Sequence, residues 1–108
     1  MLLKVAILMA EGDEPPADPV AYASRWAAVD PDRTPFLVAL FRLGAPDLAS
    51  VLSITEVVYR MTGGFDVVVV AKSMVSGATP RERTEHAVRL LKYMHNRDNV
   101  VVVTEDGP

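Results

Sequence analysis

The sequence contains no cysteine. Disulfide bonds and thiolate metal sites are therefore excluded, and nothing favours an oxidising compartment. The chain also lacks an excess of positive charge, because its formal net charge is -3, which gives no general attraction to nucleic acid. No apolar run approaches the ~20 residues of a membrane-spanning helix. These absences predict a soluble, cytoplasmic protein with no nucleic-acid or membrane partner.

What the sequence does contain is apolar residues, at 50% of its 108 positions. A chain of this length suits one domain, and it can bury roughly 65% of its unfolded surface without disulfides or metals. We expect a single domain that spans residues 1–108.

Four stretches of mainly apolar, β-branched residues predict strands that are buried in a sheet. The third stretch contains four consecutive valines, which is typical of the centre of a sheet. The predicted strands are Leu2–Ala10, Phe36–Phe41, Phe65–Ala71 and Val100–Val103.

Three helices are predicted between these strands. Asp18 and Pro19 favour a helix start, since aspartate accepts main-chain N–H bonds and proline fits the first turn. Thr79 and Glu82 form a capping box for the last helix, in which Ala87 and Val88 share the apolar face. The predicted ranges are 18–30, 47–62 and 79–95.

The alternation of strands and helices predicts an α/β fold, a three-layer sandwich with a small, mainly parallel sheet of strand order 2-1-3-4. Such Rossmann-like sheets bind ligands at the carboxyl ends of the strands where the order reverses, here strands 1 and 3. The candidate ligand-binding residues in the loops that follow these strands are Glu11, Gly12, Asp13, Glu14, Lys72, Ser73 and Ser76.

The first of these loops is acidic, which disfavours direct phosphate binding, because a carboxylate within ~4 Å of a phosphate costs about 1 kcal/mol even in water. Mg²⁺ on Asp13 and Glu14, with Lys72 as counter-charge, would be one way to hold a nucleotide. A solvated acidic loop is the simpler interpretation, and we predict no metal and no cofactor. His86 and His95 lie on roughly opposite faces of one helix and do not form a metal pair.

Several arginines and one lysine make the last helix and the residues after it locally basic. A solvated helix face is the favoured interpretation of this charge, with contact to an anion or an acidic partner as the alternative. The residues are Arg81, Arg83, Arg89, Lys92 and Arg97.

The stretch from Gly64 to Lys72, GFDVVVVAK, resembles the third strand of serine recombinases, the resolvases, invertases and large serine integrases. Pro46-Asp47-Leu48 resembles the start of a helix in that family, and the run from Val100 to Glu105 resembles its fourth strand. The resemblance covers most of the chain and implies a resolvase-like catalytic domain.

The chain departs from the family at the residues that carry its chemistry. The Tyr-x-Arg-x-Ser pattern after the first strand falls on Leu8, Ala10 and Gly12, and both arginines of the motif after the third strand are missing. Attack on a phosphodiester needs a hydroxyl nucleophile and cations around the phosphate. The resemblance therefore implies a degenerate recombinase domain without recombinase activity.

The predicted helix over residues 47–62 has more apolar surface than one sheet face can cover. Its extra face, with Ile54, Val57 and Met61, is the candidate interface of a homo-oligomer, such as a dimer, or with another protein. Our first hypothesis is a non-catalytic, recombinase-like module that acts through self-association or protein binding in a phage or mobile-element process. The alternative is a small-molecule or nucleotide-binding domain, with an enzyme that depends on Mg²⁺ as one form of it.

Overall fold

A computed structural model describes residues 2–43, 65–91 and 100–105. The predicted helix over residues 47–62 lies outside these ranges, and so do the candidate interface residues Ile54, Val57 and Met61. The described elements are β1 (Leu3–Ala10), α1 (Pro19–Ala27), β2 (Phe36–Leu43), β3 (Val67–Ala71), the 3₁₀ turn η1 (Lys72–Met74), α3 (Pro80–Leu91) and β4 (Val100–Thr104).

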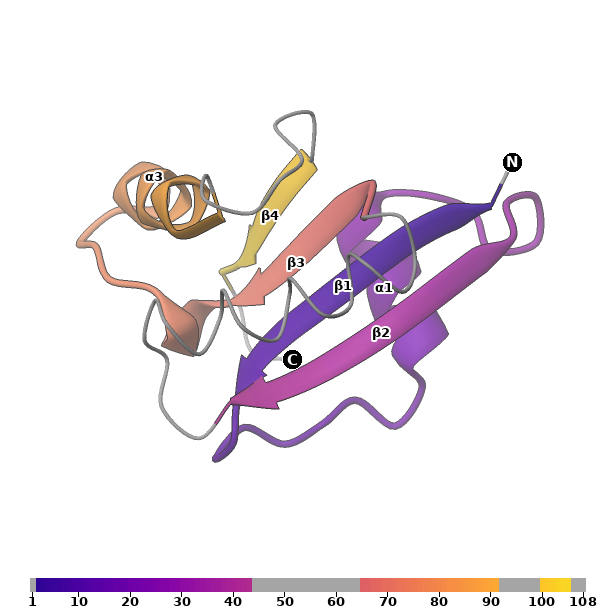
Figure 1. The fold of residues 1–108 in the computed structure, drawn as a ribbon, viewed down its shortest axis with the longest axis horizontal. Helices are drawn as coiled ribbons and strands as arrows, with labels where there is room; N and C mark the ends of the chain where they lie inside the picture. Colours follow the sequence, from indigo (N-terminus) through magenta and orange to yellow (C-terminus); the bar gives the residue numbers. More distant parts are fainter. Residues whose placement is uncertain (1, 44–64, 92–99, 106–108) are drawn as a thin grey trace.

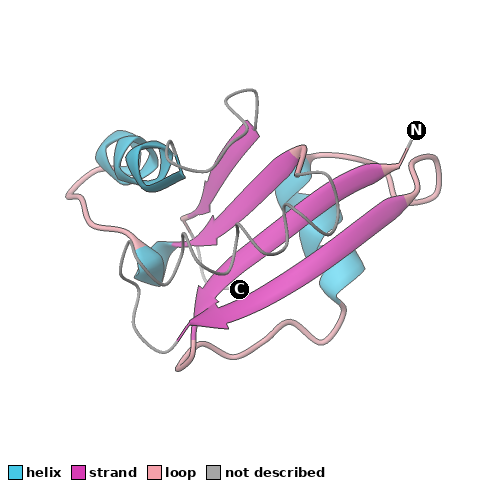
Figure 2. Ribbon diagram, in the orientation of Figure 1, coloured by secondary structure: helices cyan, strands magenta, loops and turns pink. Residues whose placement is uncertain are grey.

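The four strands form one sheet in the order β2-β1-β3-β4, and every neighbouring pair is parallel (Figures 1 and 2). This confirms the predicted α/β fold and strand order. α1 lies behind the sheet in the view of Figure 1. The step from β1 to β2 and the step from β3 to β4 run in opposite directions across the sheet. Because parallel crossovers are right-handed, the connection through α3 therefore belongs to the face opposite α1.

The core lies on β1 and β3. Residues Val5 to Met9 of β1 are buried without a break, and all five residues of β3 are buried as well. Consecutive residues point to opposite faces of a strand, so both faces of these central strands are covered.

The outer strands are less buried than their apolar sequences predict. In β2, Leu37 is 39% exposed and Phe36 is half-buried, and in β4, Val100 is 57% exposed. β2 was predicted to be a buried strand, and this is wrong in degree, because a strand at the sheet edge has a neighbour on one side only. A continuous apolar run does not distinguish an edge strand from a central one.

α1 starts where the sequence predicts and ends earlier. Oδ1 of Asp18 accepts hydrogen bonds from the main-chain N–H groups of Val20 and Ala21, both at 3.1 Å. The helix ends at Ala27 because Ala28 adopts a left-handed conformation with φ 57°, three residues before Pro31. The main-chain N–H of Val29 then donates to Ser24 O at 3.1 Å, which closes the last turn.

α3 has the predicted cap in a modified form. The main-chain N–H of Glu82 donates to Thr79 Oγ1 at 3.2 Å, as expected. The Glu82 carboxylate, however, accepts from the N–H of Ala78 at 2.8 Å and not from Thr79 itself. Ala87 is buried, whereas Val88, predicted on the same apolar face, is 47% exposed.

None of the described helices is long and apolar enough to cross a membrane.

Candidate functional site

The loops after β1 and β3 begin side by side, because these strands are neighbours and Leu8 pairs with Val70 near their carboxyl ends. This places the two groups of candidate ligand-binding residues at one edge of the sheet, as the strand order predicts. The candidate residues in the two loops differ in their hydrogen-bond partners and in their exposure.

Asp13 joins the two loops. Its Oδ2 accepts a hydrogen bond from Ser73 Oγ at 2.6 Å and another from the main-chain N–H of Ala10 at 3.0 Å. The N–H of Asp13 also donates to Ala10 O at 3.0 Å, which closes a tight turn after β1. Asp13 and Ser73 are thus brought together, but this carboxylate oxygen already accepts two hydrogen bonds within the fold.

The same turn is held from the other side by Arg42, a residue that the sequence did not single out. Its Nη2 donates to Glu11 O at 2.5 Å and to Asp13 O at 3.1 Å. Arg42 pairs with Met9 across the sheet, so its side chain begins next to the end of β1. A positive residue directly after the apolar run of β2 was the signal available in the sequence.

The remaining residues of the first loop have no role in binding the second loop. Glu11, Gly12 and Glu14 are exposed. A Cβ atom added at Gly12 would meet nothing within 4 Å, so no close approach requires glycine there.

Glu14 contributes to an open depression of about 500 Å³ beside the start of α1, away from Lys72, Ser73 and Ser76. Its lining is formed by the loop before the helix and by its first two turns. The lining residues are Glu14, Pro15, Pro16, Ala17, Asp18, Ala21, Tyr22 and Arg25.

Lys72 is exposed and follows β3 directly. Its main-chain N–H donates to Thr104 Oγ1 at 3.2 Å, which ties the end of β3 to the end of β4. Thr104 is the buried polar residue of the described core, with 3% exposure. The positive charge of Lys72 adds to the larger effect of the Arg83 hydrogen bond in lowering the pKa of Glu105.

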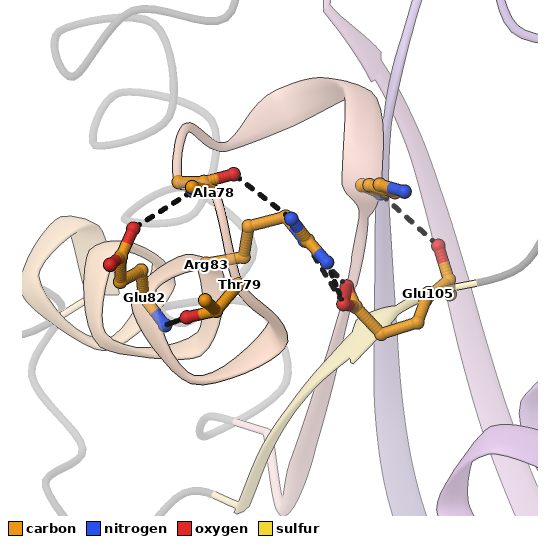
Figure 3. Close-up of polar contacts among 8 residues, drawn as sticks. Ala78, Thr79, Glu82, Arg83 and Glu105 are labelled. Atoms are coloured by element: carbon orange, nitrogen blue, oxygen red, sulfur yellow. Dashed lines mark hydrogen bonds and ion pairs between the residues drawn. The ribbon is translucent and has the colours of Figure 1, made fainter.

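Arg83 donates several hydrogen bonds near the carboxyl ends of β3 and β4 (Figure 3). Its Nε lies 2.9 and 3.0 Å from the two carboxylate oxygens of Glu105, its Nη2 donates to Oε1, and its Nη1 donates to Gly77 O at 2.9 Å. The Arg83 side chain is only 12% exposed. The interpretation of a solvated basic helix face is therefore wrong for Arg83, which connects the loop before α3 to the end of β4.

This contact changes the titration of both groups. The hydrogen bond from Arg83 lowers the pKa of Glu105 below its ordinary value, against the opposing effect of desolvation. Glu105 in turn raises the pKa of Arg83. Both groups are therefore held in their charged forms.

Ser76 does not join Asp13 and Ser73. Its main-chain N–H donates to Nδ1 of His86 at 2.8 Å. His86 is half-buried, and this contact holds the loop before α3.

The arrangement offers little for chemistry on an anion. The main-chain N–H groups of Ala78 and Glu82, which a bound phosphate at a helix start would use, are occupied by the side chains of Glu82 and Thr79. Within residues 2–43, 65–91 and 100–105, no three His, Asp or Glu side chains gather in a group that could hold a metal ion.

No protein-family model, curated protein or solved structure matches this chain.

Proposed function

We propose that this chain is a non-enzymatic module that acts through self-association or by binding another protein. The observation that supports the proposal most directly is that polar side chains at the carboxyl ends of the strands hydrogen-bond to one another. The groups that would serve a ligand there are bonded to one another, as Asp13 is to Ser73 and Arg83 is to Glu105. A new ligand would have to displace these contacts first.

The resemblance to serine recombinases supports the same proposal. The positions that match the family's tyrosine, arginine and serine hold Leu8, Ala10 and Gly12, and Leu8 is buried in the core with 1% exposure. Neither a nucleophile nor a phosphate-binding cation is present at these positions. A regulatory role in a phage or mobile-element process belongs to this proposal.

The proposal is tested by measuring the mass of the purified protein in solution. Light scattering over a range of concentrations should show a dimer or a larger species, and Val57→Glu, on the candidate interface, should shift the equilibrium to the monomer. Val88→Glu is the matched control, because Val88 is 47% exposed on α3. A monomer at all concentrations, together with no binding of the peptides described below, would contradict the proposal.

A second candidate function is the binding of a nucleotide or another small molecule, with Mg²⁺ if Asp13 and Glu14 take part. It is favoured by one observation, the meeting of the loops after β1 and β3 through Asp13 and Ser73. A thermal-shift experiment with ATP, with and without Mg²⁺, tests it. Stabilisation that is lost in Lys72→Ala would support this function, and no stabilisation in the wild-type protein would contradict it.

A further inference from the structure

β2 forms one edge of the sheet and has few of the features that protect an edge. It is eight residues long and pairs one-to-one with β1 from Phe36 to Leu43, without a bulge and without proline. It carries no charge before Arg42. Natural proteins commonly blunt exposed edges with short strands, bulges, prolines or charges, because free main-chain groups bind another strand. β4, at the other edge, is shorter, with five residues.

The register shows which main-chain groups of β2 point outward. The N–H of Leu3 donates to Pro35 O at 2.9 Å, and Leu3 pairs with Phe36 in the parallel register. Alternate residues of a strand direct both main-chain groups to the same side. The main-chain N–H and C=O groups of Leu37 and Ala39 therefore point toward β1. Those of Phe36, Val38 and Leu40 point outward, away from β1.

The side chains of this edge are apolar and accessible. Leu37 is 39% exposed, and the residues from Val38 to Phe41 are half-buried. An added strand would gain hydrogen bonds from the outward main-chain groups and apolar contacts on both faces, as in strand addition to a sheet edge.

Acidic residues precede β2 in the sequence and also occur in the loop that contacts its other end. Asp30 and Asp32 precede the strand, and Glu11, Asp13 and Glu14 lie in the loop whose carbonyl groups bind Arg42 at the other end. At the start of the strand Arg33 pairs with Asp30 at 3.7 Å, and at its end Arg42 binds main-chain oxygens. In both groups the carboxylates outnumber the arginines.

This charge pattern determines which occupant fits the edge. A second copy paired antiparallel through β2 would bring the acidic start of one strand against the acidic loop of the other. Like charges placed opposite one another suppress such a pairing. An apolar strand with lysine or arginine at its ends would instead meet carboxylates at both ends.

We propose that the outer edge of β2 binds an extended apolar segment of another protein, flanked by Lys or Arg, as a fifth strand. This inference rests on the proposed function and specifies the partner. Binding uses the main-chain groups of Phe36, Val38 and Leu40, and the acidic ends select the charge of the segment.

Two labelled peptides test the proposal, KKVVVVVKK and its acidic counterpart EEVVVVVEE. Fluorescence polarisation should show that the acidic peptide binds at least tenfold more weakly, and that binding of the basic peptide weakens as salt is raised. Val38→Pro removes an outward N–H without removing a hydrogen bond to β1, so it should abolish binding. Val38→Thr, which keeps this N–H, should not.

Amide hydrogen exchange on the wild-type protein gives a readout that does not depend on how a variant folds. The basic peptide should slow exchange at Val38 and Leu40 and leave Leu37 and Ala39, which already face β1, unchanged. Equal binding of both peptides, or protection at other strands, would overturn the inference. The inference would also be overturned if the protein is a dimer in light scattering, binds neither peptide and remains a dimer in Val38→Pro. That result would leave the proposed function intact.

Discussion

Replacing Ile7 by alanine should remove a large part of the stability of the fold. Ile7 is fully buried in β1, with 0% exposure, between Leu40 of β2 and Val69 of β3. The substitution deletes three carbon atoms, and at about 0.8 kcal/mol per buried CH₂ the loss of burial alone costs about 2.4 kcal/mol. The cavity left among the side chains on that face of the sheet raises the total to about 3–4 kcal/mol.

This loss is a substantial fraction of the free energy of unfolding of a domain, which is about 5–15 kcal/mol. It corresponds to a fall in Tm of roughly 12–32 °C, at about 4–8 °C per kcal/mol for a domain near this size. Urea unfolding followed by circular dichroism, with m-values compared, measures the difference in the free energy of unfolding.

Leu37→Ala is the matched control, because Leu37 lies in the same sheet but is 39% exposed. It should cost less than half as much as Ile7→Ala. Equal losses in the two variants, or a loss below about 1 kcal/mol for Ile7→Ala, would show that β1 is not the buried centre of the sheet.

Three further substitutions test local features of the fold. Asp18→Ala should destabilise the protein by about 1 kcal/mol in urea unfolding, since it removes the cap of α1, and Asp18→Asn should restore most of this. Gly77→Ala should cost more than about 1 kcal/mol, because Gly77 has φ 151° and an added Cβ would lie 2.8 Å from Arg83 N, whereas Gly12→Ala, in open space, should be nearly neutral. The pKa of Glu105 is lowered in the folded state, so its stabilisation is complete above its ordinary pKa of 4.5 and disappears as the pH falls through the lower, folded value. Glu105→Gln should therefore lower stability at pH 7 and reduce the loss of stability between pH 5 and pH 3, and an unchanged acid profile would contradict the role of Arg83.

Part of the candidate site could be predicted from the sequence because it follows from strand order. Once β1 and β3 are adjacent, the loops after Ala10 and Ala71 must meet, and Asp13 and Ser73 do so. That the two side chains hydrogen-bond to each other, and so occupy the site themselves, depends on rotamers and loop conformations that no local pattern records.

The sequence alone determined the features that depend on neighbours within a few residues. The apolar runs defined the strands, Asp18 and Pro19 defined the start of α1, and the alternation of elements defined the parallel order, since right-handed crossovers leave few alternatives. These signals are local because caps and strand periodicity involve residues within a single turn or strand.

Only the tertiary structure decided how deeply each apolar strand is buried and which polar groups are paired. β2 and β3 have similarly apolar sequences, yet β3 is buried and β2 is half-exposed, because burial depends on the neighbours on each side. Arg42 reaches Glu11 across 31 positions of sequence and Arg83 reaches Glu105 across 22. Contacts at such separations arise when the chain closes into a sheet, and this is the physical reason that composition and spacing did not reveal them.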